Sequence, residues 1–81
     1  MHYQIEDSNG NIDTRGNLIE AVSRACVIIA NHDDMNLLTT VNFTCDTLKH
    51  IIRMKVDPGT TFPDALLVSN NSTPVIIRKA G

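Results

Sequence analysis

The segment GNLIEAVSRACVIIAN, residues 16–31, predicts the amphipathic helix around which the chain folds. Asn17 suits the N-cap, because its side-chain oxygen can accept from the free amides of the first turn, and Glu20 follows three residues later, as in a capping box. Apolar residues recur every three or four positions and form one wide stripe, made of Leu18, Ile19, Ala21, Val22, Ala25, Cys26, Ile28, Ile29 and Ala30. Arg24 stands four residues after Glu20, and we expect these two side chains to pair. A helix this apolar must be covered by a sheet or by a second helix.

Length and composition indicate one small domain, residues 1–81. A chain of 81 residues cannot enclose two hydrophobic cores, and its hydrophobic fraction of 42% and charged fraction of 20% are typical of globular proteins. There is no Trp, and the chain has one Tyr and two Phe. Few side chains are therefore suited to stacking on single-stranded nucleic acid.

The charge is spread unevenly along the chain. The net charge is −2, but residues 1–40 carry two basic and six acidic side chains, whereas residues 41–81 carry five basic and three acidic ones. This division suits either ordinary solvated faces or a dipolar surface that docks a charged partner or a second copy of the chain.

The termini and the cysteines favour a cytoplasmic location. The start, MHYQIEDSNG, has neither the basic residues nor the apolar run of a signal peptide, and no segment is apolar over the length of a membrane span. Cys26 and Cys45 are too few for a disulfide scaffold, and we expect Cys26 to be a reduced core thiol.

Short strands and turns are expected on either side of the helix. Residues 2–6 alternate as a strand, residues 8–11 form a tight turn, and Ile12 begins a stub of a second strand. The turn lacks the spacing of a calcium loop, so we expect no metal there. Near the end of the chain, residues 65–68 and 74–79 predict a closing hairpin around a turn at residues 69–72.

Residues 37–56, LLTTVNFTCDTLKHIIRMKV, have two interpretations. Alternating polarity and many β-branched residues favour a hairpin that turns at residues 45–47. The alternative is a helix over residues 46–55 capped by Thr44, which would disperse the basic side chains of this stretch.

We therefore expect an α+β fold, with one principal helix packed on a small antiparallel sheet in the order β-α-β-β-β-β. The helical interpretation of residues 37–56 gives the alternative order β-α-α-β-β. Asp57, Pro58 and Gly59 end this region in both cases.

No constellation of residues predicts catalysis. Cys45, His50 and His32, with Asp33, Asp34 and Asp46, are the candidates, but a lone His on an apolar strand face is more often a core residue than a base. The chain has no glycine-rich phosphate loop and no zinc-type spacing of Cys and His. We expect no enzyme, no cofactor and no metal.

A basic row on the open face of the sheet is the predicted partner-binding site. In the hairpin interpretation Lys49, Ile51, Arg53 and Lys55 project away from the helix, and Arg78 joins them from the last strand. Such a face can bind a protein, contact phosphates, or stay solvated and protect the sheet from aggregation. We expect a small regulatory or accessory protein of the compact phage type, which binds another protein or a second copy of itself. The alternative is a nucleic-acid-binding regulator that uses the same cations, and no membrane partner is expected.

Overall fold

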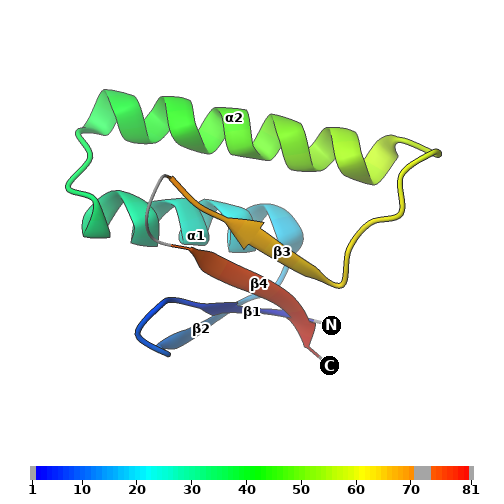
Figure 1. Cartoon of the computed structure of the whole chain (residues 1–81), viewed down its shortest axis with the longest axis horizontal. Coiled ribbons are helices and arrows are strands. Elements are labelled where there is room, and N and C mark those ends of the chain that lie inside the picture. The colour runs from blue at the N-terminus through cyan, green and yellow to red at the C-terminus, as the bar shows by residue number, and fades with distance from the viewer. Residues whose placement is uncertain (1, 71–73, 81) are drawn as a thin grey trace.

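The computed structural model describes residues 2–70 and 74–80. The elements follow one another as β1 (His2–Glu6), β2 (Ile12–Arg15), α1 (Leu18–His32), α2 (Leu37–Val56), β3 (Ala65–Val68) and β4 (Val75–Ala80) (Figure 1). The fold class is the predicted α+β class, with two helices and a four-stranded antiparallel sheet. The order of elements matches the predicted alternative with two consecutive helices. The additional strand, β2, corresponds to the predicted stub that begins at Ile12.

The sheet joins two hairpins through its central strands. The strand order is β2-β1-β4-β3, and every neighbouring pair is antiparallel. Ile5 of β1 lies opposite Ile77 of β4, and His2 lies opposite Ala80, so the first and last strands pair along their length. Residues far apart in the chain therefore form the centre of the sheet.

The first hairpin turns where the sequence indicated. The Oδ1 atom of Asp7 accepts hydrogen bonds from the backbone amides of Asn9 and Asn11, both at 2.9 Å. Gly10 has a φ of 83°, which a residue without a Cβ adopts readily. The chain then returns as β2.

Helix α1 is the middle layer of the molecule. The sheet lies on one side of α1 and α2 lies on the other (Figure 1). The core contains Ile5, Leu66, Val68, Val75 and Ile77 from the sheet, together with Ala21, Val22, Ala25, Cys26 and Ile29 from α1. Because α1 is covered on two sides, it needs the wide apolar stripe that its sequence provides.

The start of α1 is capped as predicted, but one predicted ion pair is wrong. Asn17 Oδ1 accepts from the amide of Glu20 at 2.9 Å. Arg24 does not pair with Glu20; its Nε atom donates to Oδ2 of Asp13 at 2.8 Å. This contact ties α1 to β2, a strand that the sequence indicated only weakly.

The preferred hairpin over residues 37–56 is also wrong. The whole stretch is helix α2, which ends at Val56 and has Asp57 as its C-cap. The helix begins after Asn36, whose Oδ1 accepts a hydrogen bond from the amide of Thr39 at 2.8 Å. Within the helix the hydroxyls of Thr40, Thr44 and Thr47 each donate to the carbonyl four residues earlier. These bonds satisfy the threonine hydroxyls locally, so residues that favour strands elsewhere are accommodated in a helix here.

The closing hairpin is confirmed. Strand β3 spans Ala65–Val68, as predicted, and β4 spans Val75–Ala80, one residue later than predicted. The turn predicted at residues 69–72 lies partly outside the described residues.

Candidate functional site

The structure does not bring the predicted basic row together on a sheet face. Lys49, Ile51, Arg53 and Lys55 lie on α2, where successive residues are rotated by about 100° and so point in different directions. Ile51 is 5% exposed and belongs to the core. Arg78 lies in β4 next to the buried Ile77, so it points to the face of the sheet away from α1. The predicted arrangement was wrong because a period of two was assigned to a helical segment.

Two charged members of that row have separate local partners. Arg78 donates from Nη1 to Oε1 of Glu6 at 3.1 Å across the paired strands β4 and β1. The ammonium group of Lys55 lies 5.6 Å from the centre of the Phe62 ring, where it fastens the segment after α2 to the helix. Both contacts are structural in character.

The candidate nucleophile and bases are also dispersed. Cys45 and His50 both lie on α2, and five residues of helix place them about 140° apart around the axis. His32, at the end of α1, has its Nδ1 atom 3.2 Å from Oδ1 of Asp33. Within residues 2–70 and 74–80, no group of three His, Cys, Asp or Glu side chains is placed to hold a metal ion.

Cys26 has the character of a structural thiol. It is fully buried on α1, next to the hydroxyls of Thr47 and Thr44 on α2. Burial raises the pKa of the Cys26 thiol, and the two neighbouring hydroxyls offset this only in part. The thiol is therefore neutral and inert at neutral pH.

The most unusual surface of the molecule is the side of α2 that α1 does not cover. Five aliphatic side chains there are 47% to 81% exposed, and the exposed thiol of Cys45 lies among them. We call this set the outer stripe of α2: Leu37, Leu38, Val41, Cys45, Ile52 and Val56. A solvent-exposed helix face is normally polar, so an apolar stripe of this length requires an explanation.

The outer stripe exists because α2 has a second apolar side. Ile51 is its one buried residue, and Phe43, Leu48 and Met54 are partly buried against the core. Apolar residues thus cover far more of the circumference of α2 than α1 can occupy. The apolar side chains that α1 does not cover face solvent.

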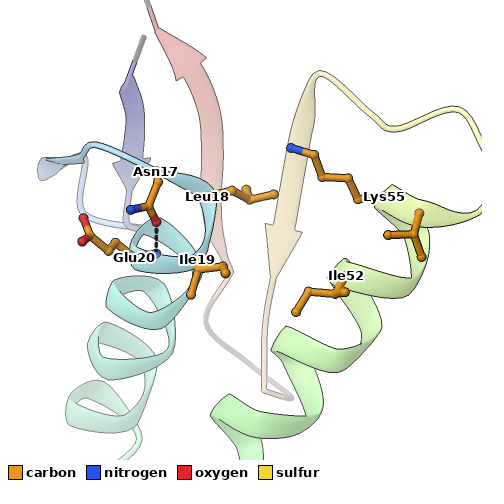
Figure 2. A pocket seen from close by; sticks show the side chains of 7 residues that line it. Asn17, Leu18, Ile19, Glu20, Ile52 and Lys55 are labelled. Atoms are coloured by element: carbon orange, nitrogen blue, oxygen red, sulfur yellow. Dashed lines mark hydrogen bonds between the residues drawn. The ribbon is translucent and has the colours of Figure 1, made fainter.

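A groove adjoins the outer stripe at the end of α2. It has a volume of about 530 Å³ and lies between the first turn of α1 and the last turns of α2. Its lining residues are Asn17, Leu18, Ile19, Glu20, Ile52, Lys55 and Val56. Figure 2 shows the side chains of Ile19 and Ile52 pointing toward one another across this groove. The aliphatic lining makes the groove suited to an apolar side chain of a partner.

The residues of the outer stripe were missed by the sequence interpretation, although a signal for them was present. Leu38, Val41, Cys45, Leu48 and Ile52 follow one another at spacings of three, four, three and four. This is the a/d pattern of helices that pair with other helices. The alternation of polarity in the same residues concealed it.

Comparison with models of protein families gives no match, and comparisons with curated proteins and with solved structures give no significant match. Among the described residues, no helix combines the length and the apolar character that crossing a membrane requires.

Proposed function

We propose that this protein is a small non-enzymatic interaction module that binds a protein partner through the outer stripe of α2. The observation that carries the proposal is the exposure of five aliphatic side chains on one side of a single helix. Single exposed leucines are common on protein surfaces, whereas several exposed aliphatic side chains on one side of a helix are typical of an interface.

The free energy available from this surface is sufficient for specific binding. Complete burial of one Val, Leu or Ile side chain contributes about 1.5–3 kcal/mol. The exposed parts of the outer stripe amount to roughly three complete side chains, so covering them contributes about 5–9 kcal/mol. Association itself costs at least about 4 kcal/mol, which leaves a moderate affinity when the partner brings an apolar surface of its own.

Nucleic-acid binding, the alternative function, depended on a row of basic side chains on one face of the sheet, and the helical α2 does not form that row. Lys49, Arg53 and Lys55 are on α2, while Arg78 is paired with Glu6 on the far side of the sheet. The net charge of −2 and the scarcity of aromatic side chains that could stack on bases also weigh against nucleic-acid binding. These observations favour a protein as the partner.

The proposal is tested by adding charge to the outer stripe and to a matched exposed leucine elsewhere. Val41→Lys and Ile52→Lys are made separately, and Leu67→Lys is the control, because Leu67 is 67% exposed on the edge strand β3. Light scattering across a range of protein concentrations measures self-association, and affinity capture followed by titration of the purified partner measures binding to other proteins.

We expect both α2 variants to lose at least ten-fold in affinity while Leu67→Lys binds as the wild type does. A wild-type protein that binds nothing at high concentration contradicts the proposal. So does binding that is lost only in Leu67→Lys. Binding to a short duplex DNA that weakens steeply with salt would instead support the nucleic-acid alternative.

A further inference from the structure

We propose that the partner of the outer stripe is a second copy of this chain, bound with its α2 antiparallel to the first. In this dimer Leu37 and Leu38 of each copy enter the groove of the other. The inference rests on the proposed function, since it names the occupant of the same surface.

The first argument is self-complementarity. Leu37 and Leu38 are 81% and 72% exposed and stand at the start of α2, while the groove lies at its end. About 16 residues of helix separate the two features, or roughly 25 Å. A two-fold axis across the middle of α2 brings the protruding leucines of each copy to the groove of the other, so the contact forms twice. A parallel pair would place leucines against leucines and leave both grooves empty.

The second argument is the spacing of the stripe. Leu38, Val41, Cys45 and Ile52 of the outer stripe, together with the half-buried Leu48 and with Lys55 at its border, occupy alternating a and d positions of a heptad. In the antiparallel register that pairs all six, Val41 faces Ile52 of the second copy, and Cys45 faces Leu48 of the second copy. Leu38 faces Lys55, whose long stem can cover the leucine while its ammonium keeps its place over the Phe62 ring. No position of this heptad row is left unmatched.

The third argument is the charge along the flank of the stripe. Asp46 lies in the first half of α2, while Lys49 and Arg53 lie in the second half. Antiparallel pairing sets this flank against the same flank of the second copy, where Asp46 stands level with Lys49, whereas parallel pairing sets it against the opposite flank of α2, which carries no acidic side chain. Antiparallel helices also oppose their dipoles. The charges therefore favour the same orientation as the leucines and the groove.

The expected affinity is modest. A helix of 20 residues is about 30 Å long, and one of its faces makes an interface at the small end of the specific range. We expect a dissociation constant on the order of micromolar. The dimer should therefore be visible in sedimentation over a range of concentrations from about 1 µM to about 1 mM.

The experiment uses charge exchange between two variants of the whole chain. Leu38→Lys changes the protruding end, and Ile19→Glu changes the groove from α1, outside the paired helix. We expect each variant alone to weaken dimerisation at least ten-fold, because every dimer then holds two introduced charges against the aliphatic side chains of the groove. An equimolar mixture should recover association to within about three-fold of the wild type. Its heterodimer has one unchanged contact, and the other contact places the introduced lysine of one variant against the introduced glutamate of the other.

Two controls keep the result interpretable, and a third measurement tests the dimer independently. Circular dichroism of both variants must match the wild type, and Leu67→Lys must dimerise normally. The alkylation rate of the exposed Cys45 should fall as the concentration of the wild type rises through the dissociation constant, since Cys45 is covered in the dimer.

Each remaining outcome overturns the inference, and the outcomes are distinguishable. A dimer that ignores both variants uses another surface. A dimer that both variants weaken but that the mixture does not rescue does not place Leu38 of one copy beside Ile19 of the other, so it lacks the proposed contact. A chain that stays monomeric yet binds another protein through the outer stripe refutes the second copy and leaves the proposed function intact. A chain that binds neither refutes both.

Discussion

Replacement of two adjacent isoleucines of α2 by alanine is expected to cost very different amounts of stability. Ile51 is 5% exposed and packs in the core, whereas Ile52 is 47% exposed on the outer stripe. Ile51→Ala removes buried methyl groups and leaves a cavity, and such changes cost about 2–5 kcal/mol, so we expect a loss of about 3 kcal/mol. Ile52→Ala leaves no enclosed cavity, and alanine is the better helix former by a few tenths of a kcal/mol, so we expect a loss below about 1 kcal/mol.

The assay is urea unfolding followed by circular dichroism at a protein concentration below the dissociation constant expected for the proposed dimer. A domain of this length has a free energy of unfolding of roughly 4–12 kcal/mol, so the loss in Ile51→Ala moves the midpoint substantially. The slope m should stay constant in both variants, because both unfold the same surface. The use of alanine at both positions cancels its helix propensity from the comparison.

The opposite order of effects would refute the helical arrangement. In two strands with the alternation of the sequence, Ile52 would face the core and Ile51 would face solvent. A large loss of unfolding free energy in Ile52→Ala with a small loss in Ile51→Ala would therefore support the hairpin interpretation instead of the helix. At high concentration the apparent cost of Ile52→Ala should rise if the outer stripe is covered, whereas the cost of Ile51→Ala should change little.

Three further predictions concern other parts of the molecule. The Thr14 amide, Arg24 and Arg15 lower the pKa of Asp13 from 3.8. The pKa of Asp13 is lower in the folded state than in the unfolded state. Its carboxylate therefore stabilises the fold at a pH above the unfolded-state pKa, and this stabilisation is lost as the pH falls through the folded-state pKa. Urea midpoints measured from about pH 5 to about pH 2 should therefore fall less steeply in Asp13→Asn. Cys26 should resist alkylation in the native state and react at the normal thiol rate in urea, because burial keeps it neutral; rapid native labelling, resolved from Cys45 by mass spectrometry, would contradict its position. Gly10→Ala should cost about 1 kcal/mol in urea unfolding from its φ of 83° alone, since a Cβ there meets no atom within 4 Å; Gly10→Asn should cost less.

Elements with one clear periodicity were predictable from the sequence. The predicted helix over residues 17–31 is observed over Leu18–His32, because its apolar stripe, its Asn17 cap and its polar flank agree. Strand β3 and the turn at Gly10 were predictable for the same reason, since each has local chemistry that permits few alternatives.

Helix α2 was not predictable with the same ease, because its residues satisfy two periods at once. Apolar residues surround most of its circumference, so alternation and helical spacing both find matches. The threonines raise the strand propensity, but their hydroxyls bond to carbonyls inside the helix. The better guides were Asn36, which caps the start, and the lack of Gly, Asn or Pro at the turn that a hairpin would need at residues 45–47.

The error in α2 also displaced the candidate site, and the reason is geometric. A period of two places Lys49, Ile51, Arg53 and Lys55 in one row, whereas a helix distributes them around its axis. The same change of period gathers Leu38, Val41 and Ile52 on one exposed side of the helix. A binding surface made of apolar residues cannot be separated from the core by sequence alone, because both obey the same pattern.

The weak attachment of α2 gives this arrangement a physical consequence. Of its 20 residues only Ile51 is buried, and its contact with α1 includes the threonines beside Cys26. Helix α2 is rich in threonine and β-branched residues, which are weak helix formers, so it depends on packing that α1 supplies mainly on one side. A partner that covers the outer stripe stabilises α2 by the same contacts with which it binds, so association and folding of this helix are linked. If the outer face of α2 were polar, a partner could not stabilise the helix by covering it. Binding of a partner would then not explain why so long a helix contacts the rest of the molecule mainly through α1.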